Sequence, residues 1–308
     1  MKKILFTLLS LFSITVYAKP IVVVSILPQE TFVQKIAKDM VDITLMVKPG
    51  NSPHSYEPKP SQMISISKAD IYFSIDVEFE NVWLDRFKSQ NKNLKVINIS
   101  DGITKIAMAG HHHHEDEHHE EESHEEEHHE KIHHEDEHDD DEHQEDHVGL
   151  DPHTWTSPKN VKIMAHNIYK ALVEIDPTNK KFYKSNLETF IKEIEATDEK
   201  IKYLLKDVKA KDKFMVFHPS WGYFANEYNL VQFAVEVEGK KPKPKDMIMI
   251  IDEAIEENVK VIFTQPEFSD KSAKIIAKAA KVSVIKISPL NPNWSDNLIS
   301  MAKAIANK

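Results

Sequence analysis

The chain of 308 residues contains no cysteine. Disulfide bonds, thiolate metal sites and a lipid anchor attached through an N-terminal cysteine are therefore excluded. Glycine is also scarce, at six residues, and none of them forms the GxGxxG or P-loop pattern that binds a nucleotide. Because no basic patch interleaved with aromatic residues occurs, nucleic acid is not an expected partner.

Long apolar runs are absent as well, apart from one near the start of the chain, over residues 4–16. This run follows two lysines and is followed by small residues up to Ala18, which is the order of a secretory signal peptide. It is too short to span a bilayer comfortably. We therefore predict a signal peptide over residues 1–18, cleaved after Ala18, and an exported chain without stable membrane insertion. A free periplasmic protein fits this pattern better than a tethered lipoprotein.

One segment, residues 111–147, holds fourteen histidines and nineteen acidic residues but a single lysine. It cannot bury enough apolar surface to offset its ordering entropy, so it is expected to be a disordered loop. Imidazole and carboxylate together favour divalent metals, although an expression tag or a solvated acidic linker are the alternatives. A tag would be terminal and purely histidine, and we therefore predict an accessory metal-binding loop. Its histidines are His111, His112, His113, His114, His118, His119, His124, His128, His129, His133, His134, His138, His143 and His147.

The acidic charge of the chain is confined to this segment. The segment carries −18 and the signal peptide +2, so the rest of a chain with a net charge of −11 carries about +5. The low isoelectric point is thus a property of the loop and not of the folded body.

Short β-branched runs alternate with helical periodicity along the rest of the chain, which predicts an α/β fold with mostly parallel sheets. The strand-like runs are 21–26, 43–47, 71–75, 96–99, 214–217, 231–235, 259–264 and 283–287. Four runs on each side of the middle of the chain predict two lobes. We place the N-terminal lobe at 19–175, a linking helix at 176–209 and the C-terminal lobe at 210–308.

Two helical patterns lie between these groups of strands. The first begins at Ser157-Pro158, a capping residue followed by proline at the first helical position, and runs to about Glu174. The second begins at Asp176-Pro177, runs to about Val208 and repeats its apolar residues at a spacing of three and four, with Thr197 as an interruption. At roughly 30 residues it would be about 45 Å long, a rigid connection between the lobes.

Four histidines occur outside the acidic segment: His54, His153, His166 and His218. His166 lies within a helical pattern, and we interpret it as a partly exposed helix residue. Each of the other three follows or precedes a proline, which restricts the loop and lowers the entropy lost when a ligand binds. A single histidine of this kind is more often a turn or packing residue. Three in similar contexts, in a chain with a metal-binding segment, predict a metal site.

The positions of these histidines along the chain support a shared site. His54 and His218 both follow predicted strands, and open parallel sheets bind ligands beyond the carboxyl ends of their strands. Aromatic residues lie nearby and could shape such a pocket and exclude water from it. These residues are Tyr56, Trp155, Trp221 and Tyr223.

With these motifs the chain resembles a known family, the zinc-binding periplasmic components of ATP-binding-cassette metal importers, or ZnuA-type solute-binding proteins. The resemblance covers nearly all of the mature chain. It rests on PHSYEP at 53–58, FENVWLDRF at 79–87, the His/acid-rich segment, DPHTWTSP at 151–158, FHPSWGYF at 217–224 and IFTQPEFSDKSAKIIAK at 262–278. It implies two α/β lobes joined by a long helix, with zinc bound in the cleft between them. It also implies that His54 and His153 come from the first lobe and His218 from the second.

The resemblance leaves the fourth ligand open. Many relatives carry a DPL motif near the C-terminus, where this chain has Ser288-Pro289-Leu290, so the usual carboxylate ligand is missing. Water, Glu57 or Glu267 could complete a tetrahedron around Zn²⁺, and water is the first expectation. Ser288 is expected to be only a turn residue.

These observations predict a monomer that captures zinc in the periplasm and delivers it to an ATP-binding-cassette permease. Manganese or another divalent metal is an alternative cargo, although a third imidazole in place of a carboxylate favours zinc. A zinc-dependent hydrolytic enzyme is a second alternative, because three histidines and an open position also form catalytic sites. No HExxH motif outside the acidic segment supports it. A third alternative is an adhesin that uses the His-rich loop.

Overall fold

The structure, a computed structural model, describes residues 18–108, 149–236 and 240–306. The predicted signal peptide up to Tyr17 and the His/acid-rich segment lie outside these ranges and remain predictions. Contacts divide the chain into two compact units. Unit 1 comprises Met1–Asp101, Lys162–Ile194 and Pro292–Trp294, and unit 2 comprises Gly102–Val161, Glu195–Asn291 and Ser295–Lys308.

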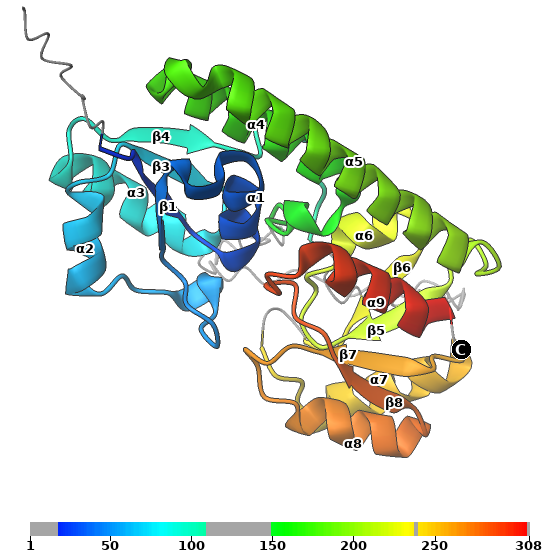
Figure 1. The fold of residues 1–308 in the computed structure, drawn as a ribbon. Coiled ribbons are helices and arrows are strands. Elements are labelled where there is room, and N and C mark those ends of the chain that lie inside the picture. Colours follow the sequence, from blue (N-terminus) through cyan, green and yellow to red (C-terminus); the bar gives the residue numbers. More distant parts are fainter. Residues whose placement is uncertain (1–17, 109–148, 237–239, 307–308) are drawn as a thin grey trace, which may run out of the picture. The chain divides into compact units, whose positions relative to one another are not determined.

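Unit 1 contains a four-stranded parallel sheet in the order β2-β1-β3-β4 (Figure 1). Its strands are β1 (Ile21–Val24), β2 (Asp42–Leu45), β3 (Ile71–Ser74) and β4 (Lys95–Asn98). Its helices and 3-10 turns are α1 (Leu27–Ala37), η1 (Lys38–Met40), η2 (Pro53–Ser55), α2 (Pro60–Ile66) and α3 (Glu78–Gln90), with most of α4 (Pro158–Ile175) and the short η4 (Pro177–Asn179). The two central strands are buried almost completely, as expected for a parallel sheet covered on both faces.

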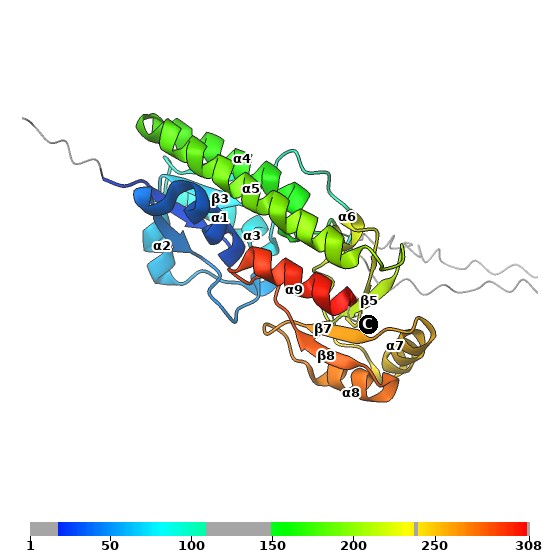
Figure 2. The same ribbon diagram turned by 45° about the vertical axis from the view of Figure 1, so that its right-hand side comes forward.

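Unit 2 repeats this plan with a parallel sheet in the order β6-β5-β7-β8. Its strands are β5 (Lys213–Val216), β6 (Val231–Ala234), β7 (Val261–Thr264) and β8 (Ser283–Lys286). Its helices and 3-10 turn are η3 (Thr154–Thr156), α6 (Gly222–Glu227), α7 (Pro244–Glu256), α8 (Lys271–Ala280) and nearly all of α9 (Trp294–Ala306). Helices α7 and α8 cover one face of this sheet and α9 covers the other (Figures 1 and 2).

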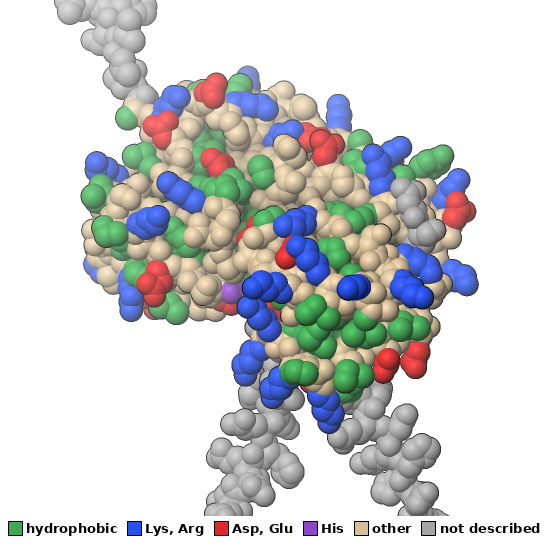
Figure 3. All heavy atoms as spheres, turned by 90° about the horizontal axis from the view of Figure 1, so that it is seen from below, with side chains coloured by type: hydrophobic (Ala, Val, Ile, Leu, Met, Phe, Trp, Pro, Cys, Tyr) green, Lys and Arg blue, Asp and Glu red, His purple; other side chains and the backbone are tan. Residues whose placement is uncertain are grey.

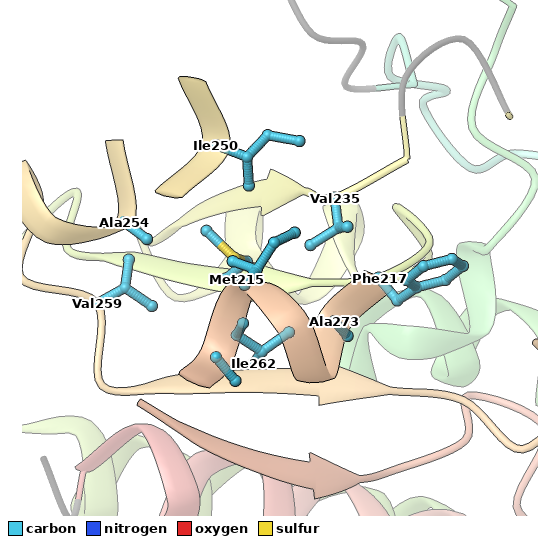
Figure 4. Close-up of a cluster of buried hydrophobic side chains, with 10 residues drawn as sticks. Met215, Phe217, Val235, Ile250, Ala254, Val259, Ile262 and Ala273 are labelled. Atoms are coloured by element: carbon cyan, nitrogen blue, oxygen red, sulfur yellow. The ribbon is translucent and has the colours of Figure 1, made fainter. Parts of the chain in front are cut away.

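The apolar core of unit 2 shows why these elements pack as layers. Met215 and Ile262 of the central strands face Ile250 and Ala254 of α7 and Ala273 of α8, and all five are at most 1% exposed (Figure 4). Burying a side chain of the size of methionine or isoleucine stabilises the fold by about 1.5–3 kcal/mol. Helix α8 carries three lysines besides its buried residues. Basic side chains and exposed apolar side chains lie side by side on the face seen in Figure 3.

The predicted fold class is confirmed, because both sheets are parallel and each of the eight predicted strand runs overlaps an observed strand. The first predicted helix is α4, and Ser157 caps it by accepting a hydrogen bond from the main-chain N of Asn160 (3.1 Å). Among the described residues, no helix has the length and apolar character needed to cross a membrane.

The second predicted helix is shorter than expected. Residues 177–179 form the 3-10 turn η4, and the α-helix α5 then runs from Lys180 to Leu205, 26 residues or about 39 Å. The side chain of Asp176 explains the late start, since its Oδ2 accepts hydrogen bonds from Asn179 Nδ2 (2.7 Å) and Tyr183 Oη (2.6 Å). Helix α5 begins in unit 1 and ends in unit 2, so it joins the two.

The contact grouping differs from the predicted domain boundaries in two places. The sequence places residues 102–161 in the N-terminal lobe, but the described part of this range, 102–108 and 149–161, groups with unit 2. The physical reason is visible at Trp155, which is fully buried and donates a hydrogen bond from Nε1 to the carbonyl of Pro289 (2.8 Å). In addition, α5 is divided between the units after Ile194 instead of forming a separate linker.

Candidate metal centre

His54 lies in the 3-10 turn η2, which follows β2 as predicted. The turn begins at Ser52, whose Oγ accepts a hydrogen bond from the main-chain N of His54 (3.3 Å), and Pro53 is buried beneath it. The imidazole Nδ1 lies 2.7 Å from Oε1 of Glu78, the first residue of α3. The histidine side chain is 23% exposed.

His153 lies immediately before the 3-10 turn η3 and is 2% exposed. Oδ1 of Asp151 accepts a hydrogen bond from the main-chain N of His153 (2.8 Å) and lies 2.8 Å from its Nδ1. Asp151 is fully buried, and the same carboxylate oxygen holds both the backbone and the ring of His153 in place. The ring also packs on Trp155, at 5.3 Å between centroids.

His218 follows the carboxyl end of β5 and is 7% exposed. Its Nδ1 lies 2.6 Å from Oε2 of Glu236, a buried carboxylate beyond the end of the neighbouring strand β6. Gln265 donates a hydrogen bond to the main-chain carbonyl of His218 (2.9 Å), and the ring of Phe268 stacks on the imidazole at 4.9 Å between centroids.

Unit 2 brings two of the predicted ligands together. The rings of His153 and His218 are 5.3 Å apart between centroids and inclined at 72°. A nitrogen of one ring lies within 4.8 Å of a nitrogen of the other. Zn²⁺ binds imidazole nitrogens at about 2.0–2.1 Å, so a pair this close can share one ion after small rotations of the rings.

A common pattern sets these three histidines apart from the fourth described histidine. In each of the three, Nδ1 lies 2.6–2.8 Å from a carboxylate oxygen, which leaves Nε2 as the nitrogen available to a metal. Histidines that bind metals usually donate their other ring N–H to a carboxylate or a carbonyl in this way. His166 is instead exposed on α4, and its Nδ1 lies 2.8 Å from the carbonyl of Lys162 in its own helix.

The two carboxylates suggested as fourth ligands are placed differently. The side chain of Glu57 is exposed. Glu267 is partly buried, and its Oε1 accepts a hydrogen bond from Ser288 Oγ (2.8 Å). Ser288 also accepts a hydrogen bond from the main-chain N of Leu290 (3.1 Å), so it forms the expected turn and in addition holds Glu267.

The aromatic residues predicted to surround the site are all buried. Trp155 and Trp221 are fully buried, Tyr223 is 4% exposed and Tyr56 is 9% exposed. Each is part of a defined contact, as for the hydroxyl of Tyr56, which donates to Gln62 Oε1 (2.6 Å). All four therefore belong to the packed interior of the protein.

A buried carboxylate also lies in unit 1, two residues after Glu78. Glu80 is 1% exposed and accepts hydrogen bonds from Ser25 Oγ and from the main-chain N of Ile75 and Asp76 (2.8 Å for Asp76). Burial raises the pKa of Glu80 to about 7, although these hydrogen bonds oppose the rise. Glu80 thus fixes the loop between β3 and α3, directly before Glu78, the residue that contacts His54.

Sequence reasoning missed the residues that orient the histidines, namely Glu78, Asp151, Glu236 and Phe268. One signal was available for Glu236, because it follows a strand of the sheet that also carries His218, and strand ends meet at one edge. Asp151 was readable from its position two residues before His153 in an Asp-Pro-His turn.

Comparisons with known proteins agree with this fold. Zinc-binding protein AdcA of Streptococcus pyogenes serotype M3 is 27% identical over 273 residues, which are 87% of this chain and 50% of AdcA, so the chain spans about half the length of that relative. High-affinity zinc uptake system protein ZnuA of Bacillus subtilis is 30% identical over 272 residues, 86% of this chain and 77% of that protein. A crystal structure of ZnuA superposes with a TM-score of 0.79 at 36% identity, covering 94% of this chain and 99% of the other.

A family model gives the widest agreement. The model described as zinc-uptake complex component A, periplasmic, matches residues 22–308, which is nearly the whole described chain. The resemblance inferred from the sequence motifs is therefore confirmed, and the chain belongs to this ZnuA family.

Proposed function

We propose that the chain binds zinc in the periplasm and delivers it to the permease of an ATP-binding-cassette importer, with His54, His153 and His218 as ligands. The observation that supports this proposal most directly is the carboxylate behind each of the three imidazoles. Family membership and the zinc-binding names of the relatives agree with it.

The donor set favours zinc over manganese. Three imidazole nitrogens suit a borderline ion such as Zn²⁺, whereas Mn²⁺ prefers carboxylate and water oxygens. Water is proposed as the fourth ligand, because Glu57 is exposed and Glu267 is already hydrogen-bonded to Ser288. Zinc is the cargo here, so a water ligand that exchanges easily also favours release.

The proposal joins ligands from both units, since His54 belongs to unit 1 and the other two histidines to unit 2. Affinity would then depend on the position of one unit against the other. A permease that binds more tightly to a different arrangement of the two units would lower the affinity for zinc. The loss of zinc-binding free energy would equal the difference between the free energies with which the permease binds the two arrangements. Capture and release would thus use the same three histidines.

Two parts of the proposal concern residues outside the described ranges. The segment 111–147 would be an accessory loop that binds additional zinc more weakly, and residues 1–18 would direct export to the periplasm. The mature protein is proposed to act as a monomer.

We propose binding and not catalysis. The relatives named above are binding proteins and an uptake component. The zinc-loaded protein should show no CO₂ hydration or ester hydrolysis above the rate of free zinc. Turnover that disappears when His153 is replaced would contradict this part of the proposal.

The ligand assignment is tested by measuring zinc affinity with a competing chelator in a protein lacking residues 111–147, so that the fourteen loop histidines do not mask the result. Replacing His54, His153 or His218 by alanine should each lower the affinity by more than about 100-fold, since loss of an outer-shell partner alone costs about 10–100-fold. His166→Ala is the matched control and should bind like the parent. A ligand variant that keeps the parent affinity would remove that histidine from the site.

A further inference from the structure

Asp151 occupies a position between the two loops that carry His153 and His218. It is fully buried, and its Oδ1 is engaged twice by His153, through the main-chain N and through the ring Nδ1, both at 2.8 Å. Its main-chain carbonyl accepts a hydrogen bond from the hydroxyl of Tyr223 (3.0 Å), and its main-chain N donates to the carbonyl of Ile106 (2.9 Å). All of these residues belong to unit 2.

The second oxygen of the same carboxylate meets the loop after His218. A Cβ atom added to Gly222 would overlap Oδ2 of Asp151, far inside van der Waals contact. The backbone of Gly222 does not itself need glycine, since its φ is not in the left-handed region. Glycine is required there because the carboxylate takes the space that a side chain would fill.

This oxygen is also unusual in its bonding. Oδ2 of Asp151 is buried and has no hydrogen-bond partner among the described residues. A buried carboxylate oxygen without a donor costs free energy and calls for an explanation by function. Here its partner oxygen holds a predicted metal ligand, so the negative charge lies directly behind the imidazole that would carry a cation.

We propose that Asp151 is a positioning residue of the metal site and that Gly222 makes room for it. The inference rests on the proposed function. By accepting from Nδ1–H, the carboxylate selects the tautomer in which Nε2 of His153 has a lone pair for the metal, and it strengthens that nitrogen as a donor. By filling the space above Gly222, it sets the distance between the His153 loop and the His218 loop.

The test uses two substitutions, one that changes the carboxylate itself and one that changes the residue next to it. Asp151→Asn keeps the size of the side chain but removes the charge, and its amide can donate to the ring and so favour the wrong tautomer. Gly222→Ala leaves the carboxylate intact but displaces it. Gly149→Ala is the matched control, because a Cβ at Gly149, two residues before Asp151, meets nothing within 4 Å.

Two quantities are measured in the protein lacking residues 111–147. The first is zinc affinity by chelator competition, which should fall about 10–100-fold in D151N and G222A and remain unchanged in G149A. The second is the ¹⁵N chemical shift of the His153 ring in the zinc-free protein. The parent and G149A should show protonated Nδ1 and unprotonated Nε2, whereas D151N and G222A should show a larger share of the Nε2–H tautomer.

The outcomes separate this inference from the proposed function. If His153→Ala binds zinc like the parent, the ligand assignment fails and the inference fails with it. If His153→Ala loses affinity but D151N retains both the affinity and the tautomer of the parent, only the role of Asp151 is overturned. A loss of affinity in G222A without any change in tautomer would overturn the link between Gly222 and the carboxylate.

Discussion

At the scale of single residues, the buried carboxylates have different roles in the two units. Asp151 and Glu236 lie behind imidazoles, whereas Glu80 accepts hydrogen bonds only from a hydroxyl and main-chain N–H groups. A carboxylate that faces a histidine can share its charge with a bound cation. Glu80 has no such partner among these contacts, and its burial therefore raises its pKa to about 7.

Glu80 makes the stability of the zinc-free protein depend on pH. In the unfolded chain its carboxyl loses the proton near pH 4.5, and in the folded protein near pH 7. Between these values the folded state binds more protons, so the contribution of Glu80 is fully present below about pH 4.5 and is lost as pH rises through 7. The loss reaches roughly 3 kcal/mol at most. Urea unfolding at pH 5 and pH 8 should show this loss of stability in the parent but not in Glu80→Gln. An equal change in the free energy of unfolding between the two pH values in both proteins would contradict the assignment of this loss to Glu80.

At the residue scale, the sequence singles out the histidines as candidate ligands but does not reveal the residues that contact their rings. Proline neighbours and strand ends single out His54, His153 and His218, because both features can be read locally. Glu236 and Phe268 reach His218 only through the order of strands in the sheet, which brings segments far apart in sequence to one edge. Ser288 was read as a turn residue, and its bond to Glu267 likewise depends on two neighbouring strand ends.

At the scale of elements, strand positions were predictable because burial on both faces requires continuous apolar runs. The ends of the helices were less predictable from the sequence. The start of α5 depends on bonds that the Asp176 side chain makes to residues three and seven positions later. Thr197, read as an interruption of the apolar face, is 2% exposed, and its Oγ1 lies 2.5 Å from Ser295 Oγ at the start of α9. A polar residue thus continues the buried face because a partner is in place.

The end of α8 offers a test at this scale. Lys281 follows the helix with φ 58° and ψ 41°, a left-handed conformation that costs a residue with a Cβ about 1–2 kcal/mol. Lys281→Gly should therefore raise the free energy of unfolding by about 0.5–1 kcal/mol, after allowance for the greater entropy of glycine in the unfolded chain. Lys278→Gly, one turn earlier within α8, should lower it by about 1 kcal/mol. Chemical denaturation measures both, and a destabilised Lys281→Gly would show that the lysine side chain contributes more than the backbone strain costs.

At the scale of the whole molecule, charge is divided between the folded body and the segment 111–147. The segment carries −18 in a chain whose net charge is −11. Deleting it should reduce the number of zinc ions bound per chain while leaving the tightest site unchanged, because the proposed ligands all lie outside it. Calorimetric titration with zinc measures both quantities. Loss of the tightest site on deletion would mean that the segment supplies an essential ligand.

Domain boundaries were the least predictable feature of the whole chain. Residues 102–108 and 149–161 are near the first sheet in sequence, yet they group with unit 2 through contacts such as Trp155 with Pro289 and Tyr223 with Asp151. These contacts join residues separated by 134 and 72 positions, so no local pattern could reveal them. The consequence is that His153 and His218 belong to one unit and His54 to the other.

The central claim is that one zinc ion is bound by Nε2 of His54, His153 and His218. It is tested most directly by the anomalous scattering of zinc in crystals of the zinc-loaded protein lacking residues 111–147. The account predicts one strong anomalous peak at about 2.0–2.1 Å from Nε2 of all three histidines, with Nδ1 of each still facing its carboxylate. A strong peak bound elsewhere, or one that lies on Nδ1 of any of the three, would contradict it.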